Sequence, residues 1–160
     1  MKSRITIEPV IQLERTGCGI ASAAAIAGLS YARAKAIAAS LGISAQDQRL
    51  WSETAPVRRL LGHLGVQTER SEHPFRSWAS LPDLAMLAIK WHLEQGRPCW
   101  HWVVFVRDDR GARVLDPKKG LRRNIRTDFG RIRPKWFIPV NEVRGRKGAG
   151  AANALLQAPN

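Results

Sequence analysis

The residue with the clearest chemical potential is Cys18, which lies between two glycines at the start of an apolar, alanine-rich segment running to Leu29. This segment predicts a helix. A cysteine in the first turn of a helix experiences the positive end of the helix dipole and the unpaired backbone N–H groups there. Both favour the thiolate, which is the nucleophilic form of cysteine. We therefore expect Cys18 to be a nucleophile, with Gly17 and Gly19 allowing a substrate backbone to lie close to the sulfur.

A thiolate nucleophile needs a nearby base and a group that orients the base. His101 lies on a predicted strand, and the hairpin turn that follows returns the chain to Asp116, directly before Pro117. We expect Asp116 to meet His101 across adjacent strands, orient the imidazole and stabilise its charged form. The alternative is a core histidine, with Asp116 capping the turn before Pro117. The remaining histidines are expected to have structural or surface roles: His63, His73 and His92.

Gln12 completes the predicted site. Its side-chain amide could stabilise the oxyanion of a tetrahedral intermediate together with the backbone N–H of Cys18. The alternative is an exposed polar residue at the end of a strand. No metal or other cofactor is expected, although a zinc set of Cys18, Cys99, His101 and Asp116 is a further alternative whose spacing matches no common zinc pattern. A disulfide between Cys18 and Cys99 is also left open.

The elements that must position these residues follow from apolar periodicity and turn signals. Helices are expected over 18–29, 31–41, 55–64 and 81–95, an extended arm or edge strand over 4–12, and strands over 66–70, 99–106, 112–115 and 135–140. Pro139 places the last strand near a sheet edge. The stretch 118–133 is expected to be irregular. Helices followed by an antiparallel sheet indicate an α+β domain over 1–141, with a disordered basic and Ala/Gly-rich tail over 142–160.

Three motifs resemble the papain-like cysteine peptidases, most closely the bacterial branch of bacteriocin-processing, double-glycine-leader peptidases. In chain order they are Gln12-x5-Cys18-Gly19-x-Ala21, His101-Trp-Val-Val104 and Leu115-Asp116-Pro117-x-x-Gly120. The resemblance implies a papain-like fold, with the cysteine on a central helix packed against an antiparallel sheet. It also implies a peptide or protein substrate and four roles: Cys18 as nucleophile, His101 as general base and acid, Asp116 as orienting acid and Gln12 in the oxyanion hole. At position 17, where the leader peptidases usually carry an acid, this chain has glycine.

The charge of the chain suggests a second function. The formal net charge is +13, and residues 107–147 hold 14 Lys/Arg and 5 Asp/Glu. This basic region could bind an anionic partner such as nucleic acid or an acidic protein, with Trp136 and Phe129 stacking on bases. A binding module is therefore one alternative to a cysteine hydrolase, and a thiol acyltransferase using the same residues is another. No signal peptide or apolar run of membrane-spanning length is recognised, so a cytoplasmic protein is expected.

Overall fold

The computed structural model describes residues 6–144, which form three α-helices and a seven-stranded antiparallel sheet. The predicted α+β class is therefore confirmed. The α-helices are α1 (Cys18–Ala27), α2 (Tyr31–Ser40) and α3 (Ala55–His63), and the short 3-10 helices are η1 (Gln48–Trp51) and η2 (Phe129–Arg131). The strands are β1 (Val66–Thr68), β2 (His73–Pro74), β3 (Leu84–Glu94), β4 (Arg97–Asp108), β5 (Gly111–Leu115), β6 (Ile125–Arg126) and β7 (Pro134–Val143).

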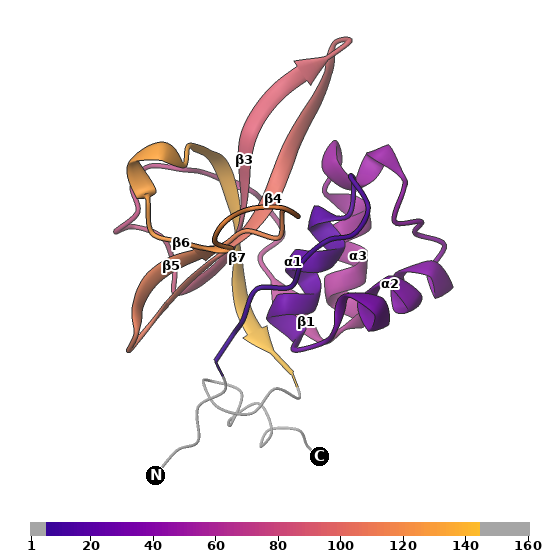
Figure 1. Ribbon diagram of the computed structural model, residues 1–160, viewed down its shortest axis with the longest axis horizontal. Helices are drawn as coiled ribbons and strands as arrows, with labels where there is room; N and C mark the ends of the chain where they lie inside the picture. Colours follow the sequence, from indigo (N-terminus) through magenta and orange to yellow (C-terminus); the bar gives the residue numbers. More distant parts are fainter. Residues whose placement is uncertain (1–5, 145–160) are drawn as a thin grey trace.

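The sheet has the order β1-β7-β3-β4-β5-β6, and β2 pairs with β7 beside β1. The helices gather on one side of the sheet, and the β3–β4 hairpin extends well beyond the other strands (Figure 1). None of the helices within residues 6–144 has the length and apolar character that crossing a bilayer requires.

Helix α1 is the central helix that its composition predicts. All of its residues except Ala27 are buried, because it packs against β4 on one side and against α2 and α3 on others. Its alanines give small contact surfaces that allow these elements to approach closely. The helix ends at Gly28, whose φ of 77° is the left-handed conformation that glycine adopts without strain.

The other two helices also follow from local sequence signals. The side chain of Ser30 caps α2 by accepting a hydrogen bond of 3.1 Å from the backbone N–H of Arg33. Helix α3 buries the stripe formed by Val57, Leu60 and Leu61, which the spacing of these residues predicts.

The predicted helix over 81–95 is wrong, because Leu84–Glu94 is strand β3. The strand lies in the interior of the sheet, between β7 and β4, and its residues from Ala85 to Ile89 are buried because other side chains cover both faces of the sheet. Met86 and Ala88 join the cluster under the helices, whereas Leu87 belongs to the cluster on the opposite face. A strand buried on both faces has a continuous apolar run, which periodicity alone does not distinguish from a buried helix.

The far end of β3 is also different from the prediction. Trp91 and Leu93 lie within the range of the predicted helix, and their exposed fractions are 37% and 57%. The pairing of β3 with β4 shifts between Ile89 and His92, and Lys90 has a φ of 55° at this irregularity. The hairpin leaves the body of the sheet at this point, and residues 90–98 are exposed.

Strand β7 covers the last predicted strand and lies next to β1 at the edge of the sheet. It is an interior strand, and Pro139 faces the break between β1 and β2, where its carbonyl accepts a hydrogen bond of 3.1 Å from Glu69. A proline is accommodated there because the break lacks a ladder partner for a backbone N–H. The strand runs to Val143, past the expected domain end at residue 141. The rest of the expected tail, 145–160, lies outside the described residues.

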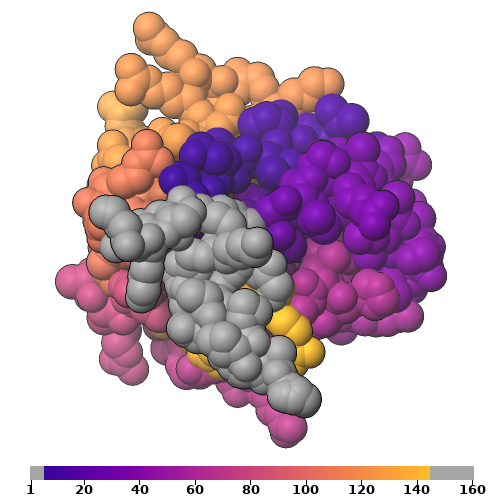
Figure 2. Space-filling model, turned by 90° about the horizontal axis from the view of Figure 1, so that it is seen from below, coloured from indigo at the N-terminus to yellow at the C-terminus, as the bar shows by residue number. Residues whose placement is uncertain are grey.

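The N-terminal arm links the two halves of the fold. Residues 6–12 form no strand, but the backbone N–H of Gln12 donates a hydrogen bond of 2.9 Å to the carbonyl of Pro117. Figure 2 shows this arm, in indigo, between the helices in purple and the segment after β5 in orange. The segment that carries Cys18 is thereby tied to the segment that carries Asp116.

Candidate active site

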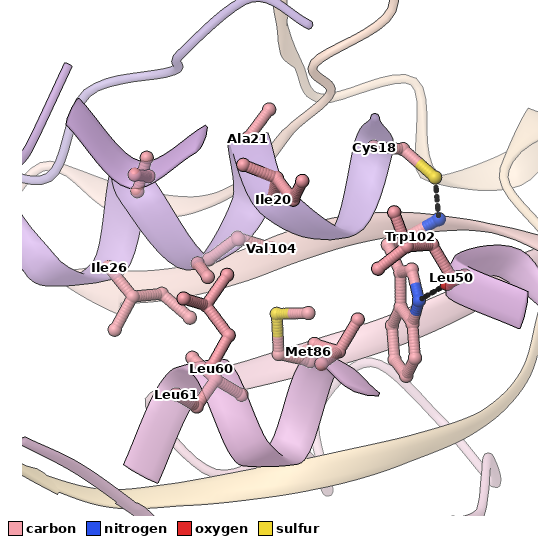
Figure 3. Close-up of a cluster of buried hydrophobic side chains, with 14 of the residues drawn as sticks. Cys18, Ile20, Ala21, Ile26, Leu50, Leu60, Leu61, Met86, Trp102 and Val104 are labelled. Carbon is pink, nitrogen blue, oxygen red and sulfur yellow. Dashed lines mark hydrogen bonds between the residues drawn. The ribbon is translucent and has the colours of Figure 1, made fainter. Parts of the chain in front are cut away.

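Cys18 occupies the first turn of α1, where the sequence places it, and its side chain is fully buried. Its sulfur accepts a hydrogen bond of 3.4 Å from the backbone N–H of Trp102, and the indole of Trp102 donates to the carbonyl of Leu50 at 2.9 Å (Figure 3). The start of the helix is therefore docked on β4 beside His101, and the thiol is shielded from solvent in this structure.

The glycines that flank Cys18 have a different role from the one expected. A Cβ atom at Gly17 would lie 2.2 Å from the hydroxyl oxygen of Tyr31, and one at Gly19 would lie 2.6 Å from Val57 and 3.0 Å from Trp102. Both positions are therefore glycine because the surrounding side chains leave no room for a Cβ. Internal packing, rather than access for a substrate backbone, accounts for the two glycines.

His101 and Asp116 are brought together as the sequence predicts, but not as direct cross-strand partners. The imidazole Nε2 lies 2.7 Å from Oδ1 of Asp116. Because Val104 pairs with Leu115, continuing the ladder places residue 116 opposite residue 103. The contact is therefore diagonal, and Asp116 reaches His101 from just beyond the end of β5.

Asp116 is buried and His101 is partly buried, with exposed side-chain fractions of 1% and 14%. Burial opposes the charged imidazolium, but the hydrogen bond to Asp116 and then the neighbouring Cys18 outweigh it and raise the pKa of His101 to about 9. Burial also opposes the carboxylate, yet the contact with His101 and further hydrogen bonds lower the pKa of Asp116 to about 2. The geometry thus favours the pair formed by the charged imidazole of His101 and the carboxylate of Asp116, which is the state that His101 reaches once it has accepted a proton.

Two residues that support Asp116 were not anticipated from the sequence. Arg126 donates a hydrogen bond of 3.0 Å to the second carboxylate oxygen of Asp116 and also pairs with Asp128. Asn124 donates from its side chain to the backbone carbonyl of Asp116 at 2.7 Å. Both belong to the stretch 118–133 that was expected to be irregular, and they contact Asp116 because β6 pairs with β5. No local signal in the sequence identifies them.

Gln12 lies near the site, but its amide donors are already used. Its Nε2 group donates to the backbone carbonyls of Glu14 and Arg15, at 2.9 and 3.0 Å. Its Oε1 atom is buried without a hydrogen-bond partner among the described residues. In this structure Gln12 therefore shapes the loop before Cys18, and its role in an oxyanion hole stays a prediction.

A cleft of about 470 Å³ opens beside His101 and Gln12. Its walls include Trp100 and the loop from Leu13 to Arg15, and the guanidinium of Arg15 lies 5.1 Å from the ring centre of Trp51. This loop is anchored at Glu14, which accepts hydrogen bonds from Tyr31 and Lys35. The cleft could hold an extended segment of a substrate next to the imidazole.

The residues of the alternative zinc set do not form one cluster. Cys18 and Cys99, both within the described range, are free thiols. Over residues 6–144, the only His, Cys, Asp and Glu side chains grouped closely enough to share a metal ion are His92, Glu94 and Cys99.

The chemistry available at the candidate site is nucleophilic. A thiol, an imidazole and a carboxylate lie in series, with the thiol at a helix N-terminus and the carboxylate fixed by an arginine. Such a series can transfer a proton from the thiol to the imidazole and stabilise the resulting cation. The chain matches no protein-family model, and no curated protein sequence is similar to it at a significant level.

Proposed function

We propose that the chain is a papain-like cysteine hydrolase that cleaves a peptide or isopeptide bond. The observation that carries the proposal is the position of His101, which is hydrogen-bonded to Asp116 at 2.7 Å and precedes Trp102, whose backbone N–H donates to the sulfur of Cys18 at 3.4 Å. The chain order of glutamine, cysteine, histidine and aspartate, and the placement of the cysteine on a helix packed against an antiparallel sheet, also support it.

In the proposed reaction, His101 accepts the proton of Cys18 and the sulfur attacks the carbonyl carbon of the scissile bond. The tetrahedral intermediate collapses to a thioester on Cys18, and the imidazolium gives its proton to the leaving amine. His101 then removes a proton from a water molecule, which attacks the thioester and releases the acid. Asp116 keeps the imidazole in the orientation that the two proton transfers need. A thiol acyltransferase would follow the same steps with a different acceptor in place of water.

The test compares the rate of alkylation of Cys18 by iodoacetamide in the wild type and in His101→Gln. Cys18 is buried, and we expect the need for the sulfur to become accessible to be the same in both proteins, so that it cancels in the ratio. We expect the wild type to react faster by roughly 100-fold or more, the usual contribution of a positioned general base.

The matched control is Cys99→Ser, which removes the other cysteine and should leave the rate at Cys18 unchanged. Mass spectrometry of the labelled peptides assigns the modified residue. Equal rates at Cys18 in the wild type and His101→Gln would overturn the proposed role of the imidazole.

A second candidate function is the binding of a single-stranded nucleic acid. It is favoured by a cleft of about 480 Å³ whose described lining includes five cationic side chains and no carboxylate. The cations are Lys90, Arg126, Arg131, Arg133 and Lys135. Trp91 also lines this cleft, and Lys135 lies 4.8 Å from the centre of its ring. A base could stack on this exposed indole while the cations contact phosphates.

The aromatic residues expected to stack on bases have other contacts. The ring centre of Trp136 lies 4.9 Å from that of Trp100, and the ring centre of Phe129 lies 4.7 Å from that of Trp78. Trp91, which is exposed and lines the basic cleft, is therefore the better stacking surface.

A filter-binding titration with a single-stranded oligonucleotide at several salt concentrations tests this second candidate. The double variant Arg131→Ala/Arg133→Ala should weaken binding and reduce the slope of log affinity against log salt by about 1.4, the value for two lost contacts to single-stranded phosphates. The control Arg122→Ala/Arg123→Ala removes the same charge from the same region outside the cleft. Equal slopes for the two double variants would exclude the cleft as the binding site.

A further inference from the structure

The projecting end of the β3–β4 hairpin brings three metal-ligand side chains together. His92 and Cys99 are direct cross-strand partners, and Glu94 lies two residues beyond His92 on the same strand. One ligand atom from each, an imidazole nitrogen, a sulfur and a carboxylate oxygen, lies within 4.8 Å of the other two. His92 also lines the cleft beside His101, but none of the three side chains takes part in the chemistry proposed above.

The backbone around His92 is arranged to orient its ring. The irregularity between Ile89 and His92 includes Lys90, a non-glycine residue with a φ of 55°, and such strained positions cluster at functional sites. The carbonyl of Lys90 lies 2.9 Å from Nδ1 of His92, which leaves Nε2 directed at Glu94 at 3.0 Å. A backbone carbonyl that fixes one ring nitrogen while the other faces the ligands is the usual outer contact of a metal-binding histidine.

This part of the hairpin is not paired with any other strand of the described sheet. The pairing of β3 with β7 ends at Ile89, and the pairing of β4 with β5 begins at Val104. From Lys90 to Cys99 the hairpin is therefore a two-stranded ribbon, and residues 90–98 are exposed. An isolated two-stranded hairpin is only marginally stable in water, so a link between its strands would stabilise it.

We propose that His92, Glu94 and Cys99 bind a divalent transition-metal ion of the zinc class, which joins the two strands of the hairpin. Imidazole and thiolate ligands select zinc and similar ions over magnesium and calcium. Zinc bonds of about 2.0–2.3 Å imply ligand atoms roughly 3.3–3.7 Å apart in a tetrahedral site. The ligand atoms therefore need to move by only about 1 Å, and a water molecule takes the fourth position.

Metal binding at this site releases protons. The Cys99 thiol gives its proton to solvent, His92 binds through an unprotonated Nε2, and Glu94 supplies a carboxylate oxygen. Binding should therefore strengthen as the pH rises.

The probe for this site is Co²⁺, titrated into the full-length chain in place of zinc. Tetrahedral cobalt with a thiolate ligand gives intense visible bands and a near-ultraviolet thiolate-to-cobalt charge-transfer band. We expect both in the wild type, and we expect Zn²⁺ to displace them. Cys99→Ser should abolish the charge-transfer band, and His92→Ala and Glu94→Gln should each weaken cobalt binding by roughly 100-fold or more, as expected for loss of a direct ligand.

Two controls separate this site from others in the chain. His73→Ala removes a histidine that pairs with Glu69 at 2.8 Å but lacks a neighbouring thiol, and it should leave the cobalt spectrum unchanged. Cys18→Ala removes the only other cysteine and should also preserve the charge-transfer band. His92 and Glu94 are exposed, so their variants should fold normally even if Cys99→Ser does not.

Three results would overturn the proposal. The first is a wild-type spectrum without a charge-transfer band. The second is a band that survives Cys99→Ser and disappears in Cys18→Ala, which would place the metal at the candidate active site. The third is equal cobalt affinity in His92→Ala and His73→Ala, which would show that the hairpin imidazole is not a ligand.

Discussion

Replacing Asp116 with asparagine tests the electrostatic basis of the candidate site. The substitution keeps the shape of the side chain but removes the negative charge that faces His101. Arg126 retains Asp128 as a partner, so the variant does not leave a buried cation unpaired. Burial lowers the pKa of His101, and the carboxylate is the main group that counteracts this effect. Without the carboxylate, we expect the pKa to fall from about 9 to near or below its ordinary value of 6.5.

The size of the effect follows from the shift. A change from about 9 to 6.5 corresponds to roughly 3 kcal/mol of preference for the imidazolium in the folded state. Cys18 supplies part of it, but the hydrogen bond to Asp116 is the larger favourable cause. Because the folded pKa of His101 is raised, this stability is fully present below pH 6.5 and is lost as the pH rises through about 9.

The pKa of His101 can be read from an NMR titration of the imidazole ring protons, with the His101 resonance assigned by its absence in His101→Gln. Urea unfolding at about pH 6 and about pH 10 measures the linked stability. The wild type should lose up to roughly 3 kcal/mol more between these two pH values than Asp116→Asn does. A pKa near 9 that persists in Asp116→Asn, or an equal loss of stability in both proteins, would refute this account of the site.

Two further predictions concern the helices that position the site. Gly19→Ala should destabilise the fold by about 1–3 kcal/mol in urea unfolding, because its Cβ would collide with Val57 and Trp102. Helix propensity alone predicts the opposite, a gain of about 1 kcal/mol, so the sign of the change decides between the two effects. Ser30→Ala should cost about 1 kcal/mol because the backbone N–H of Arg33 loses its cap, and an unchanged free energy of unfolding would show that solvent replaces the cap fully.

The elements with strong local signals could be predicted from the sequence. Helix α1 follows from its run of small apolar residues, α2 from the cap at Ser30, and the β4–β5 hairpin from the turn at Asp108 to Gly111. Strand β3 could not be predicted in this way. Its apolar run is explained by the two hydrophobic clusters that cover opposite faces of the sheet, and these clusters form only in the tertiary fold.

The candidate site shows the same division. Cys18 and the contact between His101 and Asp116 follow from residue type and from the fold-back of a hairpin. Arg126 reaches Asp116 only through the pairing of β6 with β5, which leaves no pattern in the sequence. Gly19 is likewise required by a contact between elements that are distant in the chain. The local sequence suggests that it makes room for a substrate, whereas in the structure it makes room for Trp102.

The hydrogen bond from Gln12 to Pro117 joins two segments that lie far apart in the sequence, and this separation affects the order of events during synthesis. Cys18 is made about a hundred residues before Asp116, and at ~5–20 residues per second the delay is roughly 5–20 s. During this time the helix segment exists without its base, its acid or the strand that covers its sulfur. Under the proposed function, the thiol of a nascent chain therefore lacks its catalytic partners. Hydrolysis begins only when β4, β5 and the strands that follow them have formed.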